Sequence, residues 1–241
     1  MIDASLDEYG PIEYDDHPPF HYPDYRSTSK RHPIEERIRI AQTLSEVTGP
    51  GPVFAELTEE DADLTTNAGT GGEALGARII ITGHVYLEDG TPLPGTMIEI
   101  WQADTSGRYA HWRETEFPGP KDPNFIGVGQ VVTDETGGYR FTTVKPGPYP
   151  WGNHPNAWRP SHIHFSLMGP ALGSRLVTQM YFPGDPLFPL DPIFMSVPAH
   201  ARERLVSGFE HSVSVESWAL GYRFDFVLRG PRATPFEGEE V

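Results

Sequence analysis

The stretch HIHFSLM, residues 162–168, alternates between polar and apolar side chains. Successive side chains of a β-strand point to opposite faces, so His162 and His164 would share one face. The apolar residues between and after them would share the other face, which is fit to pack against a core. An imidazole pair of this kind is either a polar, solvent-facing surface or two ligands of a metal ion. The HxH pattern alone does not separate these two interpretations.

Further stretches have the composition of strands, and turn signals rich in Gly and Pro separate them. These stretches are 77–90, 96–104, 127–144, 175–182 and 221–228, and 127–144 reads as strand, turn, strand. In this part of the chain, only residues 199–207 have a helical composition. Short strands at such spacing favour a sandwich or a barrel. We expect a mainly β fold, with an antiparallel or mixed β-sandwich core, an extended N-terminal arm and short helices.

The first part of the chain lacks this pattern. Residues 1–33 are rich in Pro, Tyr, His and charge and predict an extended arm, and 34–48 fit a helix and a strand equally well. Residues 58–76 form a polar loop rich in Gly and Thr. We therefore expect an arm with irregular and short-helix segments over 1–76 and a β-sandwich catalytic domain over 77–241. The two would form one structural unit.

Composition excludes several classes of protein. A net charge of −16 argues against a nucleic-acid-binding protein, which needs a basic surface, and gives no reason to bind an anionic membrane. Cysteine is absent, so a metal site would have to use His, Tyr, Asp, Glu or water. The acidic N-terminus lacks the apolar region of a signal peptide, and no apolar run has the length of a membrane span. We expect a soluble, cytoplasmic protein.

Two loops carry further candidate ligands. Tyr109 follows a strong strand in QADTSGRYAHW, and Tyr149 stands near the start of a loop stiffened by several prolines. Each tyrosine alone is more simply a core or surface aromatic residue. Tyr149 nevertheless lies on the same loop and strand as His162 and His164, and Tyr109 would reach them if the two strands are neighbours.

These motifs resemble those of a known family. EIWQADTSGRY (99–109) and PGPYPW…WRPSHIHF (147–165) are similar to the metal-binding motifs of the intradiol ring-cleavage dioxygenases. The arm HPPFHYPDYRST and the ending GYRFDFVLRG resemble the β chains of the members that cleave protocatechuate. The resemblance extends from about His17 to Arg229, and the order Tyr…Tyr…HxH is rare outside this family.

The resemblance implies one non-haem iron(III) ion per chain. Its ligands would be Tyr109, Tyr149, His162 and His164 with a solvent hydroxide, and Tyr149 and His164 would be axial. Two tyrosinates and a hydroxide neutralise the ferric charge, which avoids the cost of burying an isolated charge. A catechol dianion that replaces one tyrosinate and the hydroxide keeps that sum at zero.

The resemblance also implies the reaction and the partner. The protocatechuate-cleaving members convert 3,4-dihydroxybenzoate and O2 into 3-carboxy-cis,cis-muconate, a step of aromatic catabolism in the β-ketoadipate pathway. They work with a homologous α chain, so we expect αβ protomers within a larger oligomer. Catechol and hydroxyquinol enzymes of the family carry an N-terminal helical segment, whereas the first part of this chain is rich in Pro and irregular.

Further candidates follow from their positions, and two of them, Arg159 and Tyr25, match functional residues of the family. Arg159 would stabilise negative charge on the substrate ring, and Tyr149 would accept a proton from the catechol when the substrate displaces it. Gln179, on a neighbouring strand, would hydrogen-bond near the site. The predicted pocket lining comprises Tyr25, near the substrate carboxylate, Trp151 and Ile193, with Trp101 packed beneath it or in the core.

Two alternatives stay open at this point. A cupin-like enzyme would combine the HxH pair with Glu203, Glu210 and His211 around Fe(II), Mn or Zn, but it would leave both tyrosines without a role. A non-enzymatic β-sandwich binding module would hold no metal. Colour distinguishes both alternatives from the iron(III) site, because tyrosinate bound to iron(III) makes a protein red-brown and the alternatives are essentially colourless.

Overall fold

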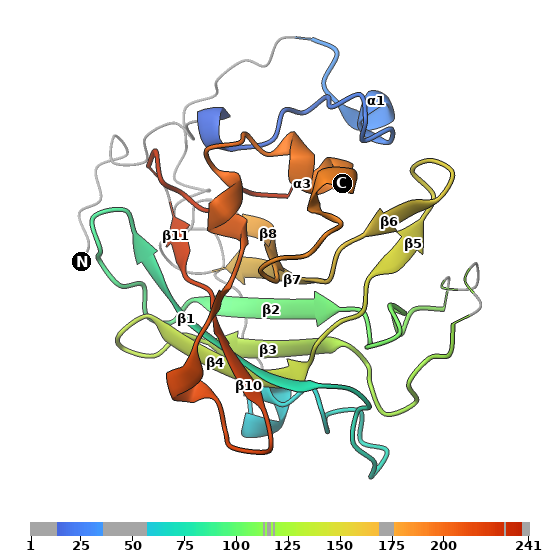
Figure 1. Ribbon diagram of the computed structural model, residues 1–241. Coiled ribbons are helices and arrows are strands. Elements are labelled where there is room, and N and C mark those ends of the chain that lie inside the picture. The colour runs from blue at the N-terminus through green and yellow to red at the C-terminus, as the bar shows by residue number, and fades with distance from the viewer. Residues whose placement is uncertain are drawn as a thin grey trace.

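The computed structural model describes residues 14–35, 57–112, 114, 117, 119–168, 176–228 and 230–237 (Figure 1). The helix or strand predicted over 34–48 falls outside these ranges, apart from its first two residues. Within the described residues, no helix has both the length and the apolar character that crossing a membrane requires.

Strand β1 (Arg78–Leu87) is the centre of a five-stranded sheet. It pairs antiparallel with β4 (Gly138–Val144) and parallel with β10 (Leu220–Arg223) and β11 (Phe226–Leu228). Strand β9 (Gly208–Phe209) pairs antiparallel with β10. The run of β-branched residues at its start suits a strand that has neighbours on both edges. The parallel pairs make this sheet mixed.

The second sheet is antiparallel and has four strands. Its order is β3 (Val128–Val132), β2 (Met97–Gln102), β7 (His162–Met168) and β8 (Leu176–Tyr181). The register places Trp101 of β2 and Gln179 of β8 on either side of His164. A small separate hairpin, β5 (Tyr149–Trp151) and β6 (Ala157–Arg159), pairs Tyr149 with Arg159.

The core lies between the two sheets and confirms the predicted sandwich. Ile163, Phe165 and Leu167 of β7 are fully buried against residues of the first sheet such as Ile81 and Phe226. Burying each such side chain stabilises the fold by about 1.5–3 kcal/mol. The alternation in HIHFSLM therefore has its predicted meaning, with one face in the core and the histidines on the other.

The predicted strand 221–228 is interrupted at Phe224 and Asp225. Phe224 donates its N–H to the Thr82 carbonyl (2.9 Å), and the Asp225 carboxylate accepts the His84 N–H (2.9 Å). Gly83 stands opposite, and a Cβ there would collide with the Phe224 carbonyl oxygen. Lack of a side chain at Gly83 thus lets the chain continue along β1 as two strands in place of the predicted single one.

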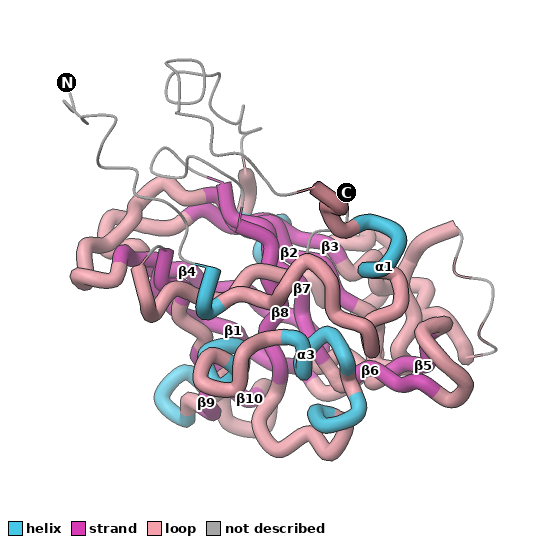
Figure 2. Tube along the Cα trace, turned by 90° about the horizontal axis from the view of Figure 1, so that it is seen from above, coloured by secondary structure: helices cyan, strands magenta, loops and turns pink. Residues whose placement is uncertain are grey.

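The helices are short and surround the strands in Figure 2. They are η2 (Tyr14–Asp16), α1 (Thr28–Arg31), η3 (Glu59–Ala62), η4 (Phe188–Leu190), α3 (Pro192–Ser196), η5 (Arg202–Leu205) and η6 (His211–Val213). Helical composition at 199–207 produces only η5. Helix α3 was not predicted from the sequence. Asp191 caps it by accepting the Ile193 N–H (3.1 Å), and Pro192 takes its first position.

Residues N-terminal to β1 contribute to the sandwich core as well. Leu64 is fully buried in the core, and its N–H donates to the Thr142 carbonyl of β4 at 2.9 Å. The predicted division of the chain at residue 76 stays a prediction, while the packing of Leu64 is typical of one structural unit.

Candidate active site

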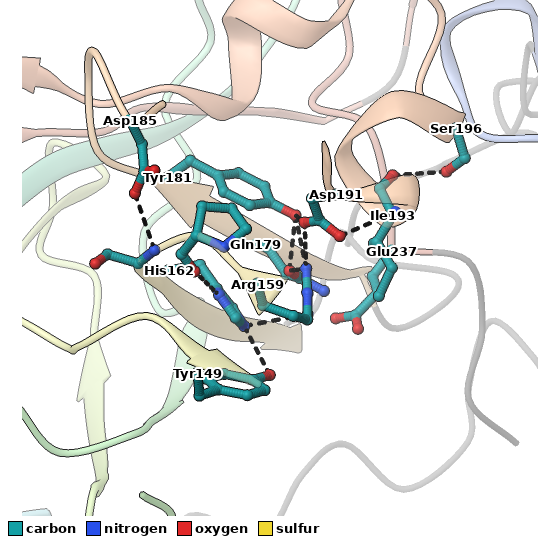
Figure 3. Close-up of polar contacts among 12 residues, drawn as sticks. Tyr149, Arg159, His162, Gln179, Tyr181, Asp185, Asp191, Ile193, Ser196 and Glu237 are labelled. Carbon is teal, nitrogen blue, oxygen red and sulfur yellow. Dashed lines mark hydrogen bonds and ion pairs between the residues drawn. The ribbon is translucent and has the colours of Figure 1, made fainter. Parts of the chain in front are cut away.

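Four side chains converge on the face of the second sheet that is opposite the core. The Nε2 atoms of His162 and His164 are 3.1 Å apart, the Tyr149 hydroxyl lies 3.4 Å from His162 Nε2, and the Tyr109 hydroxyl lies 3.2 Å from His164 Nε2. Both histidines come from one face of β7, Tyr149 comes from β5 (Figure 3) and Tyr109 comes from the loop after β2. The structure thus brings together all four predicted ligands.

A tight turn holds Tyr109 beside Tyr149. The Asp104 carboxylate accepts the N–H groups of Ser106 (2.8 Å) and Arg108 (3.0 Å), which closes the loop before Tyr109. Gly107 has a φ of +76°, and a Cβ there would run into the carbonyl oxygen of Pro148. The two loops therefore touch through their backbones, one residue before Tyr149.

Nδ1 of each histidine has an oxygen atom as its hydrogen-bond partner. Nδ1 of His162 lies 2.7 Å from the Pro160 carbonyl oxygen, and Nδ1 of His164 lies 3.0 Å from a carboxylate oxygen of Glu237. An oxygen acceptor at Nδ1 requires a proton there, so in the neutral ring Nε2 carries the lone pair. Both Nε2 atoms lie within 3.4 Å of a tyrosine hydroxyl.

Burial sets the charge of these groups. It raises the pKa of Tyr109 well above the ordinary value, with Tyr149 adding to the effect, and it also raises the pKa of Tyr149. Burial, followed by the positive charge of Arg159, lowers the pKa of His162 well below its ordinary value. The set therefore contains a neutral imidazole at His162 and two phenols that only a strong cation would deprotonate.

The donor atoms fit a metal ion. Neighbouring donors are 3.1–3.4 Å apart, and one first-row ion at ~2 Å from each would bridge such distances. Across the described part of the chain, no three His, Asp or Glu side chains gather into a metal-binding group. A metal site at His162 and His164 therefore needs the two tyrosines.

Arg159 lies directly beside this set and is almost sealed from water. One guanidinium nitrogen is 3.2 Å from His162 Nε2, and the other donates to Gln179 (2.7 Å), Tyr181 (3.0 Å) and Asp191 (2.9 Å) (Figure 3). The carboxylate of Asp191 is fully buried. This network holds a positive charge at a fixed place next to the candidate ligands.

The arm reaches the site through Tyr25. Its ring is buried and lies 5.6 Å from the ring of Trp151, and the Arg159 guanidinium lies 5.7 Å from that same tryptophan. Asn153 anchors the arm, because its side chain accepts the Arg26 N–H (2.9 Å) and donates to the Asp24 carbonyl (2.8 Å). Two residues predicted to line the pocket are thus neighbours.

Ile193 and Trp101 also lie next to the network. Ile193 is buried in α3, and its N–H donates to the Asp191 carboxylate that pairs with Arg159. The Trp101 ring stacks on the His164 ring with centroids 4.9 Å apart and an angle of 8° between planes. Trp101 therefore packs on a candidate ligand and does not belong to the buried core.

The residues required for a cupin-like site do not lie beside the histidine pair. Glu210 caps η6 by accepting the Ser212 N–H at 3.1 Å, and the side chains of Glu203 and His211 are exposed. Their positions give no support to a site shared with His162.

Sequence reasoning missed Tyr181, Asp191 and Glu237. Tyr181 follows Gln179 by two residues on β8, so alternation along the strand could have found it. An Asp before a Pro could have signalled the start of α3, though not the pairing of Asp191 with Arg159. Nothing local marks Glu237, which is separated from His164 by 73 residues.

Comparison with known proteins agrees with this geometry. A family model described as Dioxygenase matches residues 49–230, and one described as Protocatechuate 3,4-dioxygenase beta subunit N terminal matches residues 13–43. The protocatechuate 3,4-dioxygenase beta chain of Burkholderia cepacia is 52% identical over 227 residues, which covers 94% of this chain and 96% of that one. The chlorocatechol 1,2-dioxygenase of Rhodococcus opacus is 32% identical and covers 74% of this chain and 70% of its own.

Solved structures show the same fold. The crystal structure of chlorocatechol 1,2-dioxygenase from Pseudomonas putida matches with a TM-score of 0.52 and 26% identity, over 73% of this chain and 69% of that one. In a catechol, positions 1 and 2 carry the hydroxyl groups, as positions 3 and 4 do in protocatechuate. Cleavage between two such carbons is intradiol cleavage, and the chain belongs to the intradiol ring-cleavage dioxygenase family.

Proposed function

We propose that this chain is the β subunit of an enzyme that cleaves protocatechuate with O2 to 3-carboxy-cis,cis-muconate. The observation that carries the proposal is the convergence of Tyr109, Tyr149, His162 and His164 beside a buried arginine. Similarity over 94% of the chain to a protocatechuate 3,4-dioxygenase beta chain supports the choice of substrate. The proposal includes the cytoplasmic location that the sequence predicts.

The donor set suits iron(III). Two phenol oxygens and two imidazole nitrogens would hold the ion, and hard anionic oxygen donors favour the ferric state. When bound, the ion acts as a Lewis acid and as a template that orients the catechol toward O2. Two tyrosinates supply most of the charge needed to balance it in a buried place.

Tyr149 is suited to handle a proton. Its hydroxyl lies at the edge of the set, 3.4 Å from His162 Nε2, and burial raises its pKa. A free phenolate at this position would therefore take up a proton readily. We assign Tyr149 the uptake of one of the two catechol protons.

Arg159 provides the fixed positive charge. Its contacts with Gln179, Tyr181 and Asp191 keep the guanidinium in place before the substrate arrives, so no reorganisation is needed when negative charge develops on the ring. Gln179 acts by orienting Arg159. Trp151 and Tyr25 form an aromatic wall on the side of the arm, and Ile193 adds an apolar contact.

The partner would be a homologous α chain. The matching family model over residues 13–43 is named for a beta subunit, and so is the Burkholderia cepacia relative. We propose αβ protomers in a larger oligomer, with the aromatic arm as part of the contact surface. A chain that is stable and fully active when purified alone would contradict this arrangement.

One spectrum tests the proposal. The purified αβ protein should show a red-brown charge-transfer band, which should shift when protocatechuate is added without oxygen. Admitting O2 should then consume protocatechuate and release the muconate product, whereas catechol and hydroxyquinol should react more slowly. An iron-supplied protein that stays colourless would overturn the proposed site, and faster turnover of catechol would overturn the proposed substrate.

A further inference from the structure

We infer that Glu237, in the C-terminal tail, is a positioning residue that fixes the ring of His164 and thereby strengthens metal binding. The inference rests on the proposed metal site. It concerns a candidate ligand, His164, whose ring contacts a side chain 73 residues away in the chain.

The contact itself is buried and charged. A carboxylate oxygen of Glu237 lies 3.0 Å from His164 Nδ1, and both side chains are only 9% exposed. The carboxylate holds the proton on Nδ1, so the Nε2 lone pair faces Tyr109 and His162. A charged acceptor at Nδ1 also makes the imidazole a stronger donor at Nε2.

His162 offers an internal comparison. Its Nδ1 is held by the Pro160 carbonyl, a neutral acceptor two residues away that comes with the local backbone. The acceptor of His164 is a side chain from the far end of the chain. Trp101 stacks on the His164 ring and limits its tilt, but stacking does not choose which nitrogen faces the site. Glu237 supplies that choice.

Hydrogen bonds hold the tail in register along two strands. Glu237 donates its N–H to the Val177 carbonyl of β8 at 2.7 Å, and the Thr178 hydroxyl donates to the Pro235 carbonyl at 2.5 Å. The Thr234 N–H donates to the Val227 carbonyl at 2.8 Å, and the Thr234 hydroxyl accepts the Val227 N–H at 2.9 Å. The carboxylate of Glu237 is therefore presented from a fixed backbone.

The N-terminal arm contacts the same C-terminal tail. The His17 ring stacks on Phe236 with centroids 4.0 Å apart, and His17 Nδ1 accepts the Phe236 N–H at 3.2 Å. Arg204 donates to the Ala233 carbonyl at 2.7 Å and pairs with Asp16 at 2.9 Å. We call Asp16, His17, Arg204, Ala233 and Phe236 the terminal clasp. Through it, both ends of the chain support one candidate metal ligand.

The test measures iron binding and colour in the intact αβ protein. Glu237→Ala and Glu237→Gln should weaken iron affinity, measured by competition with a chelator, by about 10–100-fold for the alanine variant. Glu237→Gln keeps a neutral oxygen acceptor and should lose less. Both should shift the tyrosinate charge-transfer band, which a merely structural role in the tail would leave in place.

Two controls make the outcomes distinct. Glu216→Ala removes an exposed carboxylate in the turn before β10 and should leave affinity and band unchanged. His17→Ala should weaken iron binding through the terminal clasp, by less than Glu237→Ala. Iron affinity within twofold of the wild type in both Glu237 variants would overturn the inference. Absence of iron binding and colour in the wild type would instead overturn the proposed function.

Discussion

The guanidinium of Arg159 donates to the carboxylate of Asp191 at 2.9 Å, with side chains only 3% and 0% exposed. The pair joins the hairpin of β5 and β6 to the start of α3. Burying two charges is costly, and here Gln179 and Tyr181 accept further hydrogen bonds from the same guanidinium nitrogen. Such a pair is weak evidence for stability but fixes a charge in space, which is what the proposed chemistry requires.

Removing Asp191 should strongly destabilise the fold. Asp191→Ala would leave the Arg159 charge buried without its counter-ion, which costs about 3–5 kcal/mol in the free energy of unfolding. Denaturant unfolding monitored by tryptophan fluorescence measures this loss. The matched control is Glu73→Ala, which breaks the more exposed pair with Arg78 and should cost less than about 1 kcal/mol. Equal losses in the two variants would contradict the proposed importance of burial.

Replacing Arg159 should separate turnover from metal binding. Arg159→Lys keeps a positive charge for Asp191 but loses the planar fork that reaches several partners at once. We expect kcat to fall by about 10²-fold while iron content and the visible band are retained. Stopped-flow turnover and iron assay on the same samples give the comparison. Unchanged kcat would show that the guanidinium has no role in the reaction.

Tyr149, which is partly buried, and Tyr139, which is buried, provide a comparison for the metal site. Tyr149→Phe should alter or abolish the charge-transfer band and lower iron affinity, because it removes a proposed ligand oxygen. Tyr139→Phe removes a hydroxyl that donates to the Phe224 carbonyl at 2.6 Å, and should cost about 1 kcal/mol of stability without a spectral change. Identical spectra for Tyr149→Phe and the wild type would exclude Tyr149 as a ligand.

The terminal clasp should weaken in mild acid. Burial lowers the pKa of His17 from 6.5 to about 4, against the opposing effect of Asp16 and with a smaller contribution from Arg204. Because the folded pKa is depressed, the unfolded chain binds the proton first. The contribution of His17 to stability is therefore complete above pH 6.5 and is lost as the pH falls toward 4.

Unfolding curves of wild type and His17→Gln at several pH values test this prediction. The difference in unfolding free energy between the two proteins should shrink from pH 7 to pH 4.5, because the variant cannot take up the proton. A difference that stays constant over that window would mean that His17 titrates alike in the folded and unfolded chain. His200, which is exposed and also contacts Asp16, is present in both proteins.

Much of the fold was predictable because strand faces follow from local geometry. The alternation around His162 and His164 predicted which side chains enter the core, and β7 has that arrangement. The strand predicted over 221–228 was wrong in its continuity, because its break depends on the close approach of Phe224 to Gly83 on another strand. Helix α3 was missed because five residues are too few to show a helical period.

By itself, the sequence determined that two imidazoles share a strand face, that Tyr109 follows a strand and that Tyr149 stands in a stretch stiffened by prolines. Alternation and proline restrict the backbone locally, so these features need no knowledge of the packed chain. Only the tertiary structure decided that Asp191 pairs with Arg159 and that Glu237 reaches His164. Those contacts join residues far apart in the chain, and which residues meet depends on how the whole chain packs.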